Sequence, residues 1–425
     1  MALTICLCFA LLLLAGVPIA IILGITTTVT LYLFSNTPLQ ILTQQLFNAL
    51  DKFVLLAIPF FIVAGSIMTK GAIARRLIDF VNALVGWFPG GLAIAGVLAC
   101  IFFAAISGSS PATVVAIGSI MIPALIKAGY GEKFSLGLIT VSGSLGIVIP
   151  PSIPMILYCL VMNVSVAEMF MAGVLPGLLI GAALIGYTYV VAKKHNWRIE
   201  KKGSIKEIFR TAKRGFWALL LPIIVLGGIY SGVFTPTEAA AVSVIYALLV
   251  EMLIYREFGF KDLTSVCQDA AILSACLLFI LSCAMTFIWL LTAEQLPNQL
   301  ADIIMQYIHS PWMFLLTVNI LFLVLGCFMD DVSAMLVLAP LFLETLNRYG
   351  IDLVHFGIVM VLNIQMGMLT PPFGLNLFVS SGITGKPLTR IAQGVMPFLA
   401  IMLVCLLLVT YVPAISLLLP NWLLH

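Results

Sequence analysis

Thr370-Pro371-Pro372-Phe373-Gly374-Leu375-Asn376 interrupts an otherwise apolar segment that runs from about residue 352 to residue 384. Neither proline can donate a backbone hydrogen bond, and each proline ring clashes with the preceding turn, so an α-helix does not continue through this step. In a lipid bilayer, the polar backbone groups freed by such a break must be packed within protein or line a cavity. The sequence therefore predicts a broken helix here, next to an internal site.

A second break of the same kind lies in the first half of the chain. Ile149-Pro150-Pro151-Ser152-Ile153-Pro154 interrupts an apolar segment from about 133 to 163, and the two segments align without a gap. The match continues downstream, where Ala172-Gly173-Val174-Leu175-Pro176 aligns with Gln393-Gly394-Val395-Met396-Pro397. Broken helices at matching positions of two halves are typical of the binding sites of secondary transporters. A pair of kinks that only packs helices is the simpler alternative.

Composition places the chain in a membrane. Hydrophobic residues make up 62% of the 425 residues and charged residues 9%, which excludes a soluble globular domain. The nine cysteines form no CxxC pair and the four histidines are scattered, so we expect neither a metal cluster nor a nucleophile–base pair. The sequence predicts an all-α polytopic protein of the lipid bilayer that is not an enzyme and has no organic cofactor and no nucleic-acid partner.

The chain divides into two repeats around a basic connector. We predict scaffold and arm helices in residues 1–90 and 216–310, and transport-domain segments in residues 91–192 and 311–425. Each transport segment is predicted to hold a helical hairpin, the broken helix and a further span. The connector, residues 193–215, carries nearly half of all Lys and Arg, and the positive-inside rule places it in the cytoplasm.

The order of the spans sets the orientation of the repeats. Counting outward from the connector makes the two hairpins open on opposite faces of the membrane, which is the inverted-topology arrangement of secondary transporters. The N-terminus is apolar from Ala2 and has no basic leader, so we expect a membrane segment there and not a signal peptide. Residues 1–34, with Gly16-Val17-Pro18 at their centre, fit either one tilted helix or two short ones.

Small hydroxyl, amide and glycine residues gather at the four interruptions. They are Ser107, Ser109, Ser110 and Thr113; Ser142, Ser144 and Gly146; Asp330 and Asp331; and Asn363, Gln365, Gly367, Thr370 and Asn376. Sodium prefers oxygen ligands, which hydroxyls, unwound carbonyls and one carboxylate supply. Free amides at half-helix N-termini suit an anionic substrate. For each serine or threonine, a bond back to its own helix is the alternative.

Two acidic positions need separate treatment. A carboxylate at membrane depth is costly and usually functional, so Asp330 is a candidate site residue unless water reaches the hairpin tip. Asp330 and Asp331 are adjacent and point apart, whereas an intramembrane aspartyl protease needs carboxylates that face each other from separate elements. Glu238 follows Thr235-Pro236-Thr237 at the start of a helix, where we expect a structural role at the positive dipole end.

Four ordered motifs add a family resemblance. They are Ser107-Gly108-Ser109-Ser110-Pro111-Ala112-Thr113, Ile149-Pro150-Pro151-Ser152, Thr235-Pro236-Thr237-Glu238-Ala239 and Thr370-Pro371-Pro372-Phe373-Gly374. Together they resemble the large membrane subunit of tripartite ATP-independent periplasmic (TRAP) transporters, the DctM-like proteins, over essentially the whole chain. The resemblance implies a sodium-coupled importer of organic acids in the bacterial inner membrane, with two re-entrant hairpins and an elevator mechanism. It also implies a separate small membrane subunit of the DctQ type and a soluble periplasmic binding protein.

The resemblance also implies site residues, carried onto matching positions. One sodium site involves Ser107, Ser109, Gly146, Ile149 and Pro151, and the other involves Gly326, Asp330, Gly367, Thr370 and Phe373, with the apolar residues acting through backbone carbonyls. Ser110, Ser144 and Asn376 are implied to bind substrate between the hairpin tips. The family transports C4-dicarboxylates, sialic acids and other carboxylates, and overall similarity favours the sialic acid type.

Two other functions fit the same sequence pattern. A self-sufficient ion-coupled carboxylate carrier of related architecture would need no binding protein. An ion channel with the paired breaks as its filter would conduct far faster than a carrier, but serines at one tip and aspartates at the other argue against it. A membrane enzyme has no support, because the sequence offers no nucleophile–base pair, metal cluster or phosphate loop.

Overall fold

Helices account for nearly all of the described chain. The computed structural model describes residues 2–34, 38–197, 205–372 and 374–423, and within them no strand occurs. In this part of the chain seven helical segments are long and apolar enough to cross a membrane. An eighth would come from α14 (Leu296–Tyr307) and α15 (Pro311–Gly326), which are bent by 116° relative to each other. The predicted all-α polytopic membrane protein is confirmed.

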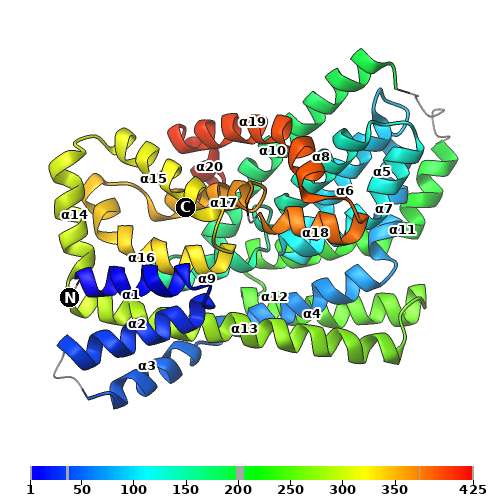
Figure 1. Cartoon of the computed structure of the whole chain (residues 1–425). Coiled ribbons are helices and arrows are strands. Elements are labelled where there is room, and N and C mark those ends of the chain that lie inside the picture. The colour runs from blue at the N-terminus through cyan, green and yellow to red at the C-terminus, as the bar shows by residue number, and fades with distance from the viewer. Residues whose placement is uncertain (1, 35–37, 198–204, 373, 424–425) are drawn as a thin grey trace.

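In the residues that the structure describes, the first repeat contains ten α-helices and two short 3-10 turns (Figure 1). They are α1 (Ala2–Leu14), α2 (Ile19–Phe34), α3 (Gln40–Leu50), η1 (Phe53–Leu56), α4 (Ala57–Lys70), α5 (Ile73–Val85), α6 (Gly91–Ser107), α7 (Ser110–Lys127), α8 (Glu132–Gly143), η2 (Ser144–Ile147), α9 (Ile153–Met162) and α10 (Val166–His195). Residues 1–34 thus contain two helices and not one. The chain turns at Gly16, whose φ of 74° favours glycine, and Pro18 follows just before α2.

The second repeat follows the same plan. It contains α11 (Ile205–Tyr230), α12 (Pro236–Leu249), the π-helical turn η3 (Val250–Tyr255), α13 (Phe260–Ala293), α14, α15, α16 (Asp331–Tyr349), α17 (Leu353–Gly367), α18 (Leu375–Thr384), α19 (Leu388–Tyr411) and α20 (Ala414–Leu423). Helices α15 to α19 each begin 220 to 222 positions after α6 to α10, respectively. In both repeats the Pro-Pro bond at the break is cis. The predicted internal duplication is confirmed.

Both broken helices stop before their Pro-Pro step and resume after it. In the first repeat the α-helical part ends at Gly143, passes through η2, and resumes at Ile153 after the two prolines. In the second, α17 ends at Gly367 and α18 begins at Leu375. Each second half crosses to the other repeat, because α9 packs against α16 and α18 packs against α7. The two hairpins and the two breaks therefore form one packed unit.

A separate group of helices lies along one side of this unit. Helix α4 packs against α12, and α13 packs against α2, α3 and α4 (Figure 1). The start of α12 carries a capping box that includes Glu238. The Thr235 hydroxyl accepts a hydrogen bond from the Glu238 amide at 3.3 Å, and the Glu238 carboxylate accepts one from the Thr235 amide at 2.8 Å. Glu238 thus has the structural role expected of it.

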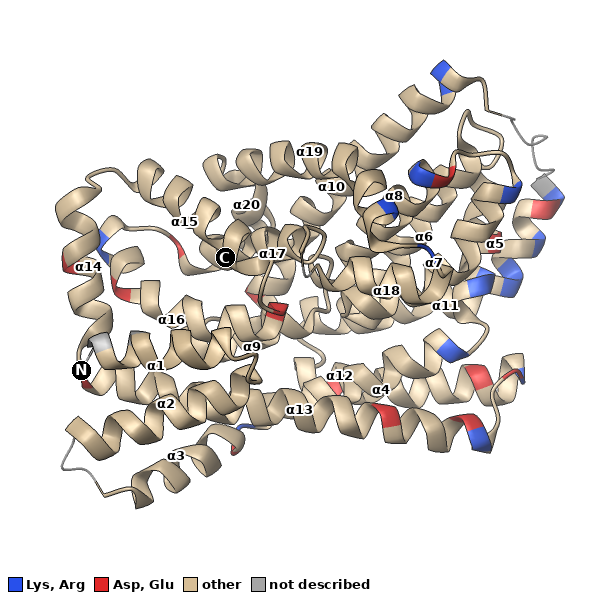
Figure 2. Cartoon of the chain, viewed as in Figure 1, with Lys and Arg blue, Asp and Glu red and all other residues tan. Residues whose placement is uncertain are grey.

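Charge is distributed unevenly along the long dimension of the molecule. Figure 2 shows most Lys and Arg near the end where α10 stops and where α5, α8 and α11 begin, and few of them near α14. Lys193 and Lys194 form the last turn of α10, and the basic residues that follow residue 205 lie in the first turns of α11. The predicted connector therefore consists largely of the ends of two long helices. Its residues 198–204 lie outside the described part of the chain.

Candidate functional site

The turn between α6 and α7 packs directly onto the first broken helix. The Ser107 and Thr113 hydroxyls lie 2.9 Å apart, and the Thr113 hydroxyl donates to the Ser109 carbonyl at 2.9 Å. A Cβ on Gly146 would lie 2.5 Å from the Ser109 carbonyl oxygen and 2.7 Å from the Thr113 hydroxyl, so only glycine fits there. The structure therefore brings Ser107, Ser109 and Gly146 together, as predicted.

The prolines of the same break contact the tip of this turn. A Cβ on Gly108 would lie 2.9 Å from the Pro151 carbonyl oxygen, and the Ile153 amide donates to the Gly108 carbonyl at 3.3 Å. No described residue donates a hydrogen bond to the carbonyl oxygens of Ile149 or Pro151. Uncommitted backbone carbonyls beside hydroxyls are a ligand set that suits a hard cation.

The second break also packs against a backbone through a glycine, but at the end of α15. A Cβ on Gly367 would lie 2.5 Å from Cα of Gly326, and Gly367 stands 221 positions after Gly146. The Thr370 hydroxyl donates to a carbonyl one turn back at 2.8 Å, while no described residue donates to the Thr370 carbonyl. The structure brings Gly326, Gly367 and Thr370 together. Phe373, predicted as a further carbonyl ligand, lies outside the described residues.

Asp330 makes different contacts. Its carboxylate accepts a hydrogen bond from the Ser333 amide at 3.1 Å and caps the N-terminus of α16. This is the only hydrogen bond of the Asp330 side chain to any described residue. Asp330 also lines a cavity of about 350 Å³ with residues 18–21 at the start of α2 and with Cys276 of α13. In this conformation Asp330 serves as a cap, and its sodium role stays a prediction.

The predicted substrate residues form bridges between the repeats. The Asn376 amide donates to the Ser110 hydroxyl at 2.6 Å, and the Gln365 amide donates to the Ser144 hydroxyl at 2.8 Å. These four side chains are all fully buried. Ser144 and Gln365 are 221 positions apart, like the two Pro-Pro steps, so their contact lies where the repeats meet. The site is closed in this conformation.

Several buried polar oxygens on the two broken helices have no hydrogen-bond partner among the described residues. Among the described residues, Ser142 Oγ, Asn363 Oδ1, Gln365 Oε1 and Asn376 Oδ1 are buried and make no hydrogen bond. Leaving a polar group buried and unpaired costs about 1–3 kcal/mol, so native structures rarely keep several together without a ligand or water. The four oxygens are therefore candidate contacts for a polar ligand.

A buried network continues from this cluster toward α20. The Asn363 amide donates to Asn319 Oδ1 at 2.7 Å, and the Asn319 amide donates to Thr410 Oγ1 at 3.1 Å. His355 lies beyond, with Nδ1 2.7 Å from Ser416 Oγ and Nε2 3.2 Å from the Thr410 carbonyl oxygen. Sequence reasoning missed this network because its members come from four helices. No group of metal-ligating side chains occurs in the described ranges.

Sequence reasoning also missed Glu251. Its side chain is fully buried, and its carboxylate accepts hydrogen bonds at 2.9 Å from the amides of Ala72 and Ile73, at the start of α5. A Cβ on Gly71 would lie 2.2 Å from this carboxylate. Glu251 therefore ties the second repeat to the first through a helix N-terminus. A lone acid inside the apolar segment 239–255 was the available signal.

Comparison with known proteins gives a family and a fold. Residues 6–415 match the model of the family described as "Tripartite ATP-independent periplasmic transporter, DctM component". The chain is 47% identical to the C4-dicarboxylate TRAP transporter large permease protein DctM of Pseudomonas aeruginosa, with 94% of each chain covered. It is 36% identical to the sialic acid TRAP transporter large permease protein SiaM of Vibrio cholerae, with 96% of each chain covered.

Among solved structures, the YdaH transporter of Alcanivorax borkumensis has a similar fold. The two superpose with a TM-score of 0.64 at 15% sequence identity, over 97% of this chain and 98% of that one. The helix breaks, the duplicated plan and the match over nearly the full length agree with one another. The chain belongs to the DctM family of TRAP transporter components, and it is a multi-pass membrane permease and not an enzyme.

Proposed function

We propose that this chain imports a C4-dicarboxylate together with sodium, as the large membrane component of a TRAP transporter in a bacterial inner membrane. The observation that carries the proposal is the pair of equivalent helix breaks, each packed against a hairpin through a glycine, Gly146 or Gly367. The word periplasmic in the family's description supports the inner membrane as its location.

Sodium coupling rests on the ligands that the two breaks offer. The carbonyls of Ile149, Pro151 and Thr370 receive no hydrogen bond from the described residues. The hydroxyl pair of Ser107 and Thr113 adds neutral oxygens at the first break. Sodium is a hard cation that accepts such carbonyl and hydroxyl ligands. One sodium ion at each break, bound before or with the substrate, would neutralise part of the substrate's negative charge.

The substrate class follows from similarity and from the cluster between the repeats. The relative named for C4-dicarboxylates is 47% identical and the one named for sialic acid is 36% identical, which favours a dicarboxylate over the sialic acid that overall sequence resemblance suggested. Helices α9 and α18 both begin beside the breaks, and their N-termini suit carboxylates. The Ser110–Asn376 and Ser144–Gln365 bridges would open to admit the substrate and bond to it.

The two groups of helices support an elevator movement. The hairpins and broken helices form one packed unit, while α2, α3, α4, α12 and α13 pack among themselves beside it. We propose that the first group moves across the membrane against the second. We further propose that a separate small membrane subunit braces the second group and that a periplasmic binding protein delivers the substrate, as the tripartite designation of the family supports.

The test is uptake into proteoliposomes that contain this chain and its small subunit. Radiolabelled succinate and radiolabelled sialic acid are compared, with and without an inward sodium gradient and the cognate binding protein. We expect succinate uptake that needs both the gradient and the binding protein. Uptake with sodium alone would make the chain a self-sufficient carrier, and a passive ion current without uptake would make it a channel.

A further inference from the structure

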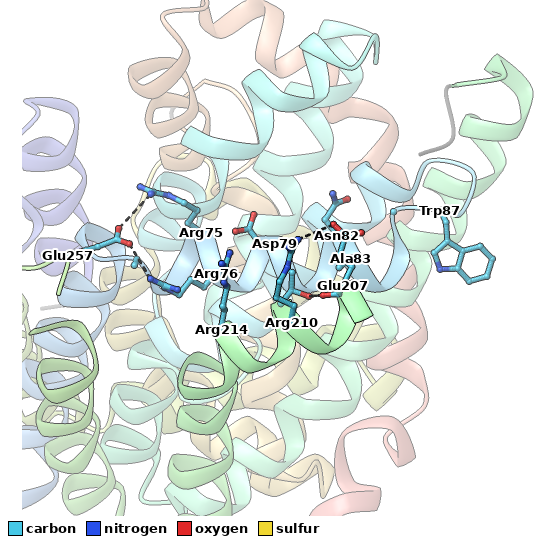
Figure 3. A pocket seen from close by; sticks show the side chains of 13 residues that line it. Arg75, Arg76, Asp79, Asn82, Ala83, Trp87, Glu207, Arg210, Arg214 and Glu257 are labelled. Carbon is cyan, nitrogen blue, oxygen red and sulfur yellow. Dashed lines mark hydrogen bonds and ion pairs between the residues drawn. The ribbon is translucent and has the colours of Figure 1, made fainter. Parts of the chain in front are cut away.

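A cavity of about 450 Å³ lies between α5 and α11, far from the helix breaks along the chain (Figure 3). Four arginines line it: Arg75 and Arg76 from α5, and Arg210 and Arg214 from α11. Three acidic residues, Asp79, Glu207 and Glu257, line it as well. The arginine side chains come from both repeats and from helices that begin at the basic end of the molecule (Figure 2).

The arginines retain unused hydrogen-bond donors. Glu257 is the acidic partner of both Arg75, at 3.6 Å, and Arg76, at 3.3 Å, while Arg210 is 3.6 Å from Glu207. Arg214 has no ion pair with any described residue. Each guanidinium carries five N–H donors, so these contacts leave most donors free. Nε of Arg76 is buried and makes no hydrogen bond among the described residues.

The wall of the cavity is held in place by its neighbours. The Arg76 guanidinium lies over the Tyr255 ring, 4.0 Å from its centroid, and the Tyr255 hydroxyl donates to the Arg214 carbonyl at 3.1 Å. The Glu251 carboxylate caps the start of α5, one turn before Arg76. These contacts hold the Arg76 side chain and the α11 backbone in place. The four guanidinium groups face three carboxylates, so the lining keeps a net charge of +1.

One apolar side chain continues the cavity face of α11. Trp217 lies three positions after Arg214, on the same face of the helix, and is 38% exposed, whereas the exposed Phe209 and Phe216 lie on the opposite face of α11. Exposed aromatic and aliphatic residues next to a row of basic residues are typical of the level where lipid headgroups meet acyl chains. The cavity is therefore placed for a ligand that has an anionic head and an apolar tail.

We infer that this cavity binds the phosphate of an anionic phospholipid, whose acyl chains lie along the exposed Trp217 side chain of α11. Arginine suits a phosphate because its planar donors match two phosphate oxygens at once. Basic pockets between membrane helices on the cytoplasmic side bind such headgroups. The bound lipid would bridge α5 of the first repeat and α11 of the second.

The test is native mass spectrometry of the full chain in detergent, titrated with dioleoyl phosphatidylglycerol, phosphatidylcholine or inorganic phosphate. Arg210→Gln with Arg214→Gln should weaken phosphatidylglycerol binding about 30-fold, since each basic residue contributes about fivefold. Lys193→Gln with Lys194→Gln removes the same charge from exposed positions on α10 and should leave binding unchanged. Arg210→Lys with Arg214→Lys keeps the charge and should recover most of the binding.

The outcomes separate the possible ligands. Preferential binding of phosphatidylglycerol that only the α11 glutamine pair reduces supports the inference. If the α10 double variant lost as much phosphatidylglycerol binding as the α11 glutamine variant, the effect would come from net charge alone and the inference would be overturned. Unchanged binding in the α11 glutamine variant would show that this cavity is not the binding site. If inorganic phosphate displaced phosphatidylglycerol from the wild type, the proposal of a lipid ligand would be overturned, and the cavity would be assigned to a soluble phosphate compound. Phosphatidylcholine binding, measured in parallel, checks that each variant is folded.

Discussion

The two helix breaks share a backbone and differ in their side chains. Gly146 and Gly367 occupy equivalent positions; Gly146 lies against the backbone of Ser109 in the first hairpin turn, and Gly367 against the backbone of Gly326 at the end of α15. At the first turn Ser109 presents its carbonyl within a network of hydroxyls, whereas its equivalent Asp330 caps α16 and faces a cavity next to α2 and α13. The glycines therefore keep the backbone packing at both breaks, while a charged side chain, Asp330, is present only at the second.

The largest effect is expected where the shared framework is blocked. Gly146→Ala and Gly367→Ala each place a Cβ 2.5 Å from backbone atoms, and overpacking of this kind typically costs about 1–3 kcal/mol. We expect each variant to lose at least about tenfold of its sodium-driven uptake, since 1.4 kcal/mol corresponds to tenfold.

Gly186→Ala on α10 is the matched control, because nothing lies within 4 Å of its added Cβ. Uptake into proteoliposomes and thermal unfolding are measured for all three variants. Wild-type uptake by either Gly146→Ala or Gly367→Ala would mean that close contact between hairpin and break is not needed.

A smaller effect should separate the two sites. Asp330→Asn removes the charge but keeps an oxygen that can cap α16, so the protein should fold and its half-saturating sodium concentration should rise about tenfold, as the loss of roughly 1.4 kcal/mol would give. Ser109→Ala should change the half-saturating sodium concentration less than twofold, because the contacts described at the first turn use the Ser109 carbonyl and not its hydroxyl. Sodium titrations of uptake measure both variants. Equal shifts of the half-saturating sodium concentration in the two variants would contradict the proposal that a side-chain charge acts only at the second site.

The mouths of the two hairpins differ in the contacts of their acidic residues. Glu132 forms an ion pair with Lys386 at 3.0 Å and accepts a hydrogen bond from Arg390 at 2.9 Å, and the contact with Lys386, together with the charges of both partners, lowers the pKa of Glu132. At the corresponding place in the second repeat, Asp352 precedes α17 and instead caps its own helix by accepting from the His355 amide at 2.9 Å.

The smallest predicted effect follows from that lowered pKa. The contribution of the Glu132 ion pairs to stability is fully present above the carboxyl's ordinary pKa, and it is lost as the pH falls through the lowered value of the folded protein. Melting temperatures from pH 7 down to pH 3 are compared for wild type and Glu132→Gln. We expect the variant to melt a few degrees lower at pH 7 and to converge with the wild type at the acidic end. A constant difference over this range would contradict an ion-pair origin.

The backbone of the site was predictable from the sequence, because Pro-Pro steps and turn-forming residues act locally. They located both breaks, both hairpin turns and the duplication, and the repeat then aligned Gly146 with Gly367. Contacts across the repeats were not predictable. The bridge from Ser144 to Gln365 depends on how the halves pack, and so does the capping of α5 by Glu251, which comes from a helix 178 residues away. Asp330 was recognised as unusual, but its cap on α16 depends on the local backbone at the turn.

Binding of radioactive sodium to the purified chain tests most directly whether the equivalent breaks are sodium sites. The wild type is compared with Gly146→Ala, Gly367→Ala and the control Gly186→Ala in a competition assay against unlabelled sodium, with potassium keeping the ionic strength constant. We predict two sodium ions per chain in the wild type and the control, and the loss of one in each of the other two variants. No specific sodium binding, or full binding in all three variants, would contradict the assignment of sodium to the two breaks.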